Sequence, residues 1–586
     1  MRRADRENTE DRVLLRALRD FNLGKLIMDD VNIFVGMIDD LFPKQREHVV
    51  RARELDFEEK IIEAAKGFHL QAEEVFVTKI SQLREIAVVR WSVFVLGPAG
   101  CGKSEMIRTL SKAQNLFGEK SSINFLNPKS VTRNELYGYI HPATREWKDG
   151  LLSQIFRDLA NIHTCKSEYL VLDGDIDAEW IESMNTVMDD NKTLTLASSE
   201  RIPLTPPMRL LLEIENMREA SPATVSRGGV IFMNETDVGW RPYVVSWIAN
   251  REYDVEKQML KKLFDSYVGT VFEWMRKNCE TIVPLPEINK VQHLCYILEG
   301  MLENGDDFAG QCKIVGQENA QQILESYFIY ASIWALGGAT FTDKQFDHRK
   351  AFDRWWKDEM KTIRIPDEGT VFDYCVDETL FPLTIDNDIL SSPFIPWSRK
   401  VQPYVHNQST VFGNIYVATM ESQRLTYLLE LLMNNKHACM LVGGAGTGKT
   451  TVMGDKLRNM DSDQYVYMNI NLNCFTDSML LQGAMESVLE KKTGRTFGPT
   501  GSKKMVYFID DINMPQVDKY GTQQPIALLR QLFDYGGWYS RDKLTWREIQ
   551  NVQCVSCLNP TAGSFFIDPR LQRSYCTYAV QLPGSE

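Results

Sequence analysis

"VFVLGPAGCGKSEMIRTL", residues 93–110, is the stretch that decides the fold of this chain. Its short apolar run with branched residues predicts a strand, the glycine-rich segment predicts a tight turn, and the remainder favours a helix. The same order of parts recurs in "CMLVGGAGTGKTTVMGDKL", residues 439–457. A strand–turn–helix unit that occurs twice predicts an α/β fold built in tandem, each copy being a parallel sheet flanked by helices.

Both turns fit the pattern GxxxxGK[ST], which is typical of a phosphate-binding loop. The glycines let backbone N–H groups surround a phosphate, the lysine reaches the β- and γ-phosphate oxygens, and the hydroxyl lies on Mg²⁺. The N-terminus of the following helix adds a partial positive charge. The pattern therefore predicts ATP or ADP with Mg²⁺ as cofactors. The predicted nucleotide-binding residues of the loops are Gly97, Pro98, Ala99, Gly100, Cys101, Gly102, Lys103 and Ser104 in the first copy, and Gly443, Gly444, Ala445, Gly446, Thr447, Gly448, Lys449 and Thr450 in the second.

Downstream of each loop an apolar run ends in an aspartate. "EYLVLDGD" has Asp173 at this point and "MVYFIDD" has Asp510. A carboxylate at the end of such a strand can hold a Mg²⁺-bound water molecule, whereas the alternative is an aspartate that merely ends a strand. The next position is Asp511 in the second copy but Gly174 in the first. The predicted Mg²⁺ residues, partly through water, are Ser104, Asp173, Thr450 and Asp510.

Further candidates for catalysis follow in the same order in both copies. The apolar runs "RLLLEIENM" and "VQCVSCLNP" end at Asn216 and Asn559, whose amides are candidates to orient an attacking water; turn formation is the alternative. Arg227 and Arg573 each precede a last strand, where a positive charge can reach the γ-phosphate of a neighbouring subunit. A surface salt bridge is the alternative for Arg227, and Arg570 is the alternative to Arg573. Asp511 is the candidate general base of the second copy.

The chain is too long for a single core and its composition changes along its length. Helical spacing in "MLKKLFDSYVGTVFEWMRKN" separates the two copies, and a segment rich in proline, aspartate and aromatic residues follows it. We expect the following domains: 1–90 a helical lead-in, 91–250 a large α/β domain, 251–360 a helical lid, 361–415 a β-rich connector, and 416–586 a second large α/β domain without its lid.

Composition excludes several functional classes. A net charge of −13 argues against nucleic acid or an anionic membrane as the main partner. The apolar stretch 327–341 is interrupted by glycines and too short to span a bilayer, which favours a buried helix. Cys554 and Cys557 form a single CxxC without a second pair, so buried thiols are favoured over zinc, and the scattered cysteines indicate a reducing, cytoplasmic compartment.

Longer motifs show a resemblance to a known family. The order of parts resembles the AAA+ ATPases, and "WIESMNTVMDDNKTLTLASSERIPL" and "SPATVSRGGVIF" resemble the second AAA+ module of dynein heavy chains. "FIDDINMPQVDKYGTQQPIALLRQLFDYGGWYSRD" resembles the third module of axonemal dyneins, and "LVGGAGTGKTTVMGDKL" favours the outer-arm β type. The resemblance covers essentially the whole chain.

The resemblance implies that this chain contributes to a ring of six AAA+ modules in a microtubule motor of the ciliary or flagellar axoneme. Its expected partners are the other modules, the linker and the stalk of the same heavy chain, together with other dynein heavy, intermediate and light chains. Microtubules would be reached only through the stalk, which we expect, like the first module, to lie outside this sequence. Arg227 would complete the main ATPase pocket of the preceding module, and Arg573 would complete the first pocket of this chain.

Gly174 leads to the main functional expectation. An intact loop with no general base should bind ATP at the first site without hydrolysing it, and Asp175 is a poor substitute because it lies one residue further along. The substitution Gly174→Glu should then restore hydrolysis that depends on Arg573. The second site should bind ATP or ADP with slow or no turnover, because Asp511 is shorter than the usual glutamate. The alternatives are a non-motor AAA+ scaffold that uses nucleotide as structural glue, and a stand-alone P-loop ATPase.

Overall fold

The structure is a computed structural model that describes residues 9–43, 53–162, 164–189, 191–304, 317–377, 385–386, 389–390, 392–405, 415–564 and 567–582. The chain forms two compact units. The first unit contains Met1–Pro242 together with Lys519–Arg547, and the second contains Tyr243–Asp518 together with Glu548–Glu586. The short segment Lys519–Arg547 therefore belongs to the first unit although the chain on both sides of it belongs to the second.

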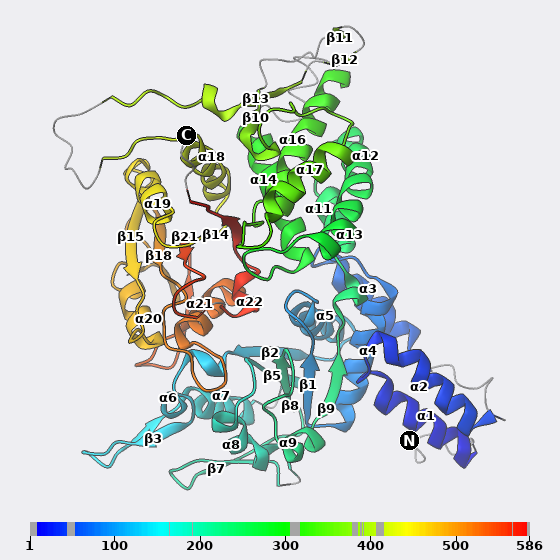
Figure 1. Cartoon of the computed structure of the whole chain (residues 1–586). Helices are drawn as coiled ribbons and strands as arrows, with labels where there is room; N and C mark the ends of the chain where they lie inside the picture. Colours follow the sequence, from blue (N-terminus) through cyan, green and yellow to red (C-terminus); the bar gives the residue numbers. More distant parts are fainter. Residues whose placement is uncertain are drawn as a thin grey trace. The chain divides into compact units, whose positions relative to one another are not determined.

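The first unit is built on a five-stranded parallel sheet in the order β2-β5-β8-β1-β9 (Figure 1). Its strands are β1 (Ser92–Leu96), β2 (Ser121–Leu126), β5 (Ser167–Asp173), β8 (Met208–Ile214) and β9 (Gly229–Phe232). Because consecutive strands in space are not consecutive in sequence, each is reached by a helical crossover. The P-loop strand β1 thus lies between β8 and β9, with β5 on the far side of β8.

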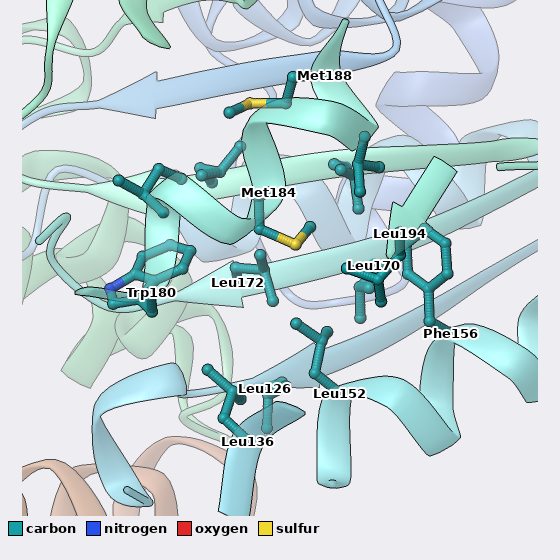
Figure 2. Packing of buried hydrophobic residues seen from close by; sticks show 14 of the residues in the cluster. Leu126, Leu136, Leu152, Phe156, Leu170, Leu172, Trp180, Met184, Met188 and Leu194 are labelled. Carbon is teal, nitrogen blue, oxygen red and sulfur yellow. The ribbon is translucent and has the colours of Figure 1, made fainter. Parts of the chain in front are cut away.

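Both faces of this sheet are buried, and successive residues of each strand point to opposite faces. Val93 and Val95 pack with α3, α4 and α5, whereas Phe94 packs in the cluster on the other face. Figure 2 shows that second cluster, in which Leu170 and Leu172 of β5 face side chains of α7 and α8. The near-continuous apolar runs of the sequence are explained by this double burial.

Helices and short hairpins cover the sheet of the first unit. Asp177 begins α8 because its side chain accepts a hydrogen bond from the backbone N–H of Trp180 at 3.0 Å. The helices and hairpins are α1 (Glu10–Leu23), α2 (Met28–Leu41), α3 (Leu55–Lys66), α4 (Glu74–Val89), α5 (Lys103–Leu116), η2 (Pro128–Ser130), α6 (Arg133–Tyr137), β3 (Gly138–Ile140), β4 (Trp147–Asp149), α7 (Leu151–Ala160), α8 (Ala178–Met188), β6 (Thr193–Thr195), β7 (Arg201–Pro203), α9 (Pro222–Arg227) and α10 (Glu235–Val238), joined by α21 (Gln524–Tyr535) and β19 (Gly537–Tyr539).

The second unit contains a five-stranded parallel sheet with the equivalent order, β15-β18-β21-β14-β22. Its strands are β14 (Cys439–Val442), β15 (Tyr465–Asn471), β18 (Lys504–Asp510), β21 (Val552–Leu558) and β22 (Cys576–Ala579). Around this sheet lie α18 (Met420–Asn434), α19 (Lys449–Arg458), α20 (Ser478–Glu486) and α22 (Pro569–Gln572), with β16 (Glu490–Lys491), β17 (Thr496–Gly498) and β20 (Trp546–Ile549) forming a smaller sheet region. The expected fold class, tandem parallel sheets flanked by helices, is confirmed.

A helical layer separates the two sheets in the sequence and packs within the second unit. Its long helices α14 and α16 lie against each other (Figure 1). The layer consists of α11 (Arg241–Ala249), α12 (Asp254–Leu263), the π-helical turn η3 (Phe264–Val268), α13 (Gly269–Asn278), α14 (Glu287–Asn304), α16 (Gln317–Gly337) and α17 (His348–Glu359), followed by η4 (Val371–Asp373), β10 (Tyr374–Val376), β11 (Ile385–Asp386), β12 (Ile389–Leu390), β13 (Phe394–Pro396) and η6 (Trp397–Arg399).

Most of the apolar stretch 327–341 lies in α16 and is buried in this layer. Trp334 of α16 makes edge-on contacts with Phe372, at 5.3 Å between ring centroids, and with Tyr578 of β22, at 6.0 Å. Within the described ranges, no helix combines the length and apolarity needed to cross a membrane. The apolar character of α16 is therefore explained by packing against its own unit.

Candidate nucleotide sites

The first P-loop connects β1 to α5 in the first unit. Gly102 immediately precedes α5 with φ of +98°, a left-handed conformation that favours glycine. Lys103 is 3% exposed. Its ammonium group donates hydrogen bonds to the carbonyl oxygens of Gly97 at 2.6 Å and Pro98 at 2.8 Å. The loop therefore holds its lysine directly over its own backbone, at the N-terminus of a 14-residue helix.

Two buried carboxylates lie side by side at the carboxyl ends of neighbouring strands of the first sheet, next to this loop. Asp173 ends β5, and the parallel register pairs it with Glu213 of β8. The two residues are 0% and 1% exposed, respectively. The hydroxyl of Ser104 donates to Glu213 Oε1 at 2.8 Å. Sequence reasoning missed Glu213; the signal that could have found it is a charged residue inside the otherwise apolar run "RLLLEI".

Asp173 has different partners. Its carboxylate forms a buried ion pair with Arg530 and accepts a hydrogen bond from the hydroxyl of Tyr535, both from α21. Tyr535 also stacks on Phe125 of β2, with ring centroids 4.8 Å apart. Asn127 donates from Nδ2 to the carbonyl of Ala527 at 3.2 Å. The helix α21 therefore packs against the carboxyl end of β5, where Asp173 lies.

Gly174 is buried and has little room for a side chain. A Cβ atom at this position would lie 3.0 Å from Asn127 Oδ1 and 3.1 Å from Cδ of Pro128. Asn127 is itself held in place, because its Oδ1 caps η2 by accepting from the backbone N–H of Lys129 at 3.0 Å. A glutamate at residue 174 would therefore require Asn127 and Pro128 to move by a few tenths of an ångström, which works against the hydrolysis expected for Gly174→Glu.

We therefore expect Gly174→Glu to lower the stability of the first unit by about 1–3 kcal/mol, the usual cost of overpacking. It should not create ATP turnover, because the contacts with Asn127 and Pro128 would turn the new side chain away from a catalytic position. Thermal unfolding and phosphate release measure the two effects. Gly174→Ala is the matched control, since it adds the Cβ alone and should cost less. An unchanged melting temperature together with new hydrolysis in Gly174→Glu would show that the site has room after all.

The second P-loop connects β14 to α19 and has the same lysine arrangement. Lys449 donates to the carbonyls of Gly443 at 2.8 Å and Gly444 at 2.7 Å, and burial lowers its pKa. The hydroxyl of Thr450 donates to Asp510 Oδ2 at 2.9 Å. Here the strand-end aspartate contacts the loop hydroxyl, and the Mg²⁺ role of the two residues stays a prediction.

Asp511 follows in a left-handed conformation, with φ of +53°. Burial and the neighbouring Asp510 carboxylate raise the pKa of Asp511, although Lys449 opposes the shift. A carboxylate with a raised pKa is a stronger base, since it binds a proton more readily at neutral pH. The second copy thus has a candidate general base, Asp511, at the position where the first copy has Gly174.

Both predicted sensor asparagines use their side chains in local turns. Asn216 Oδ1 accepts from the backbone N–H of Arg218 at 3.1 Å, and Asn559 Oδ1 accepts from the N–H of Thr561 at the same distance. Such contacts are typical of turn-forming asparagines. A role for either amide in orienting water stays a prediction.

The sheet register distinguishes the two asparagines. The P-loop strand β1 ends opposite Ile214 and β14 ends opposite Leu558. The next residue is Asn559 in the second copy but Glu215 in the first, so Asn216 lies one position beyond the equivalent of Asn559. Sequence offsets alone had placed the two asparagines at matching positions.

The two candidate arginine fingers lie at the ends of short helices. Arg227 ends α9 and forms an ion pair with Asp189, both in the first unit. Arg573 follows α22 in the second unit and is half-buried, and its carbonyl accepts from Asn289 Nδ2 at 2.6 Å. The alternative, Arg570, is 3% exposed. The greater exposure of Arg573 is consistent with its choice over Arg570, and the finger roles stay predictions.

Family models match four parts of the chain. "Hydrolytic ATP binding site of dynein motor region" matches residues 1–104, and "AAA domain (dynein-related subfamily)" matches 92–228. "Dynein heavy chain AAA lid domain" matches 260–380, and "P-loop containing dynein motor region" matches 404–583. These matches agree with the two parallel sheets and the helical layer between them in sequence.

Curated relatives align with the entire chain. It is 52% identical over 586 residues to the flagellar outer-arm dynein beta chain of Chlamydomonas reinhardtii, of which it covers 12%. It is 48% identical to the ciliary dynein beta chain of Tripneustes gratilla and 47% identical to the human dynein axonemal heavy chain 17, covering 13% of each. The chain thus spans about an eighth of the length of the curated relatives it matches.

Proposed function

This chain belongs to the axonemal dynein heavy chains and contains part of their AAA+ motor region, and from that premise we propose distinct roles for its two nucleotide sites. The first P-loop binds ATP and holds it without hydrolysis. The second binds ATP or ADP and hydrolyses slowly, in a regulatory role. The names of relatives support an outer-arm β type.

The first role is supported by the combination of a complete P-loop with a glycine at residue 174, where a side chain would be tightly packed. Lys103 and Ser104 are placed on a loop whose glycine conformation and helix N-terminus suit a phosphate. The chain supplies no carboxylate at residue 174, and even a Cβ there would lie 3.0 Å from Asn127 Oδ1 and 3.1 Å from Cδ of Pro128. Without a positioned general base, hydrolysis loses about 10²–10⁴-fold in rate.

The second role depends on Asp511. Its carboxylate lies next to Asp510, which is hydrogen-bonded to Thr450, and its raised pKa suits a general base. Aspartate is one methylene shorter than glutamate, so a water molecule must approach more closely to be activated. We propose slow turnover for this reason.

The residues present fit a nucleotide with Mg²⁺. Hydroxyl and carboxylate oxygens are the ligands that Mg²⁺ prefers, and each loop hydroxyl is within 2.9 Å of a carboxylate oxygen. When bound, the ion would neutralise charge on the phosphate oxygens. The loop lysines orient the phosphates, and the carboxylates fix the hydroxyls.

The proposal extends to the whole heavy chain. Arg227 would complete the main ATPase pocket of the preceding module, and Arg573 would complete the first pocket of this chain. The partners would be the other modules, the linker and the stalk of the same chain, with dynein heavy, intermediate and light chains beyond them. Microtubule contact would occur through the stalk, and the location would be the axoneme of a cilium or flagellum.

Nucleotide analysis of the purified chain tests the two roles. We expect denatured protein to release ATP or ADP in about a one-to-one ratio with the first loop after gel filtration. Lys103→Ala should remove it, because charge-assisted hydrogen bonds contribute about 1.5–3 kcal/mol, or roughly tenfold to hundredfold in affinity.

Lys449→Ala is the matched control at the second loop. It should leave the retained nucleotide in place and abolish the slow ATP turnover. Turnover that depends on Lys103 instead, or no nucleotide released from the wild-type chain, would contradict the proposed division of roles.

A further inference from the structure

The two sites differ in which strand provides the carboxylate that contacts the P-loop hydroxyl. In the second site the carboxylate is Asp510, at the end of β18. In the first site it is Glu213, near the end of β8, at 2.8 Å from the hydroxyl of Ser104. The strand β8 lies directly beside the P-loop strand β1, whereas β5, which carries Asp173, lies one strand further away.

The carboxylate of Asp173 contacts side chains of α21 rather than the P-loop hydroxyl. Arg530 forms an ion pair with it in which the two side chains are 3% and 1% exposed. Tyr535 donates a hydrogen bond to the other carboxylate oxygen. An aspartate with both oxygens engaged by α21 would have to give up these contacts to act on a cation, and the buried guanidinium of Arg530 would then lose a closer acidic partner than Asp534, which lies at 3.5 Å.

The second copy shows the reverse arrangement. Glu213 pairs with Val95, the residue before the last of β1, and Cys557 pairs with Leu441, the residue before the last of β14. Glu213 and Cys557 therefore hold equivalent positions in the two sheets. A cysteine side chain is a poor ligand for a hard cation such as Mg²⁺, so the second site depends on Asp510.

Burial of Glu213 also requires an explanation. A carboxylate that is 1% exposed on a central strand is costly unless strong polar partners surround it. The hydroxyl of Ser104 is such a partner, and it is the hydroxyl that the P-loop pattern assigns to Mg²⁺. Glu213 therefore lies where a divalent cation bound with a nucleotide would need an acidic group.

We propose that Glu213, and not Asp173, is the acidic residue that holds the divalent cation of the nucleotide at the first P-loop, acting with Ser104 directly or through water. Asp173 instead anchors α21 through Arg530 and Tyr535. The inference rests on the proposed function, because it requires a nucleotide at the first loop. It reassigns the Mg²⁺ role that the sequence pattern gave to Asp173.

Metal binding measured without turnover tests the assignment. The chain carries Lys449→Ala, so that the first loop is the remaining nucleotide site, and Mn²⁺ is titrated in the presence of ATPγS and followed by electron paramagnetic resonance. Glu213→Gln should weaken Mn²⁺ binding by about 10–100-fold, the usual effect of losing a carboxylate that orients a metal site. Asp173→Asn should change it by less than about threefold.

Binding of ATPγS in excess chelator provides the control for folding. Both variants should retain this metal-independent binding, because Lys103 and the loop backbone are unchanged. If Glu213→Gln also loses its metal-independent ATPγS binding, the Asp173→Asn variant provides the test of the assignment. Unchanged Mn²⁺ binding in Asp173→Asn supports Glu213 as the acidic residue, and a large loss overturns it. The same measurement in a Lys103→Ala chain gives the mirror control, in which Asp510→Asn should abolish metal binding and Cys557→Ala should not.

The outcomes separate this inference from the proposed function. The retained nucleotide is first removed from the Lys449→Ala chain. If this chain then binds no ATPγS with or without metal, the nucleotide role of the first loop fails. If it binds ATPγS but Mn²⁺ affinity falls in Asp173→Asn and is unchanged in Glu213→Gln, only the assignment of Glu213 is wrong.

Discussion

Replacing Arg530 with alanine is expected to destabilise the first unit by about 3–5 kcal/mol, since it leaves the buried carboxylate of Asp173 without its charged partner. The loss should be greatest where α21 meets β5. Hydrogen exchange of peptides from these two elements measures it, because local opening there should become roughly 10²–10³-fold more frequent. The effect belongs to the broken pair, since burial of a lone charge is costly even when the intact pair contributes little.

Two variants separate charge from packing. Combining Arg530→Met with Asp173→Asn removes both charges and should recover most of the stability lost in Arg530→Ala. Arg541→Ala is the matched control in the same segment: its ion pair with Glu135, at 2.6 Å, is partly exposed and should be worth about 1 kcal/mol or less. Exchange in Arg530→Ala that is no faster than in Arg541→Ala would show that the Asp173 pair does not hold α21 in place.

Replacing Trp180 with alanine is the second change with a large expected effect, about 3–5 kcal/mol. Trp180 is 3% exposed and packs in the cluster between β5 and α8 (Figure 2). Its indole N–H donates to the carbonyl of Asp175 at 3.2 Å, and its own carbonyl accepts from the hydroxyl of Tyr137 at 2.6 Å. The variant should therefore also loosen the turn that follows Asp173.

Urea unfolding of the purified chain measures this loss, and Trp180→Phe is the matched control. Phenylalanine keeps most of the apolar volume and loses the hydrogen bond to Asp175, so it should cost about 1–2 kcal/mol. Equal losses for the two substitutions would indicate that the indole hydrogen bond, and not the buried ring, accounts for the contribution of Trp180.

The structure relates these effects to the first nucleotide site. The segment that contains Arg530 follows shortly after Asp511 in the chain, yet it packs in the first unit. Its contacts with Asp173, Phe125 and Asn127 lie next to Gly174, where the chain has no carboxylate and an added side chain would be tightly packed. A strand end that is used for attachment in this way is poorly suited to hydrolysis, which is consistent with a site that holds its nucleotide.

The sequence by itself determined both P-loops, their lysines and hydroxyls, and the tandem parallel-sheet fold. These features are local: a phosphate loop needs its glycines, lysine and hydroxyl within eight consecutive residues, and strands buried on both faces need continuous apolar runs. Gly174 and Asp511 were recognised for the same reason, because each directly follows a strand-end aspartate.

Only the tertiary structure decided which carboxylate contacts Ser104, which residue matches Asn559, and what binds Asp173. Glu213 lies 109 residues after Ser104 in the chain and Arg530 lies 357 residues after Asp173. Such neighbours depend on the register between strands and on where a distant helix packs, and a shift of one residue in register moves a side chain to the opposite face of the sheet. Local patterns contain no information about that register, so the partners of a strand-end aspartate are known only once the sheet and α21 are assembled.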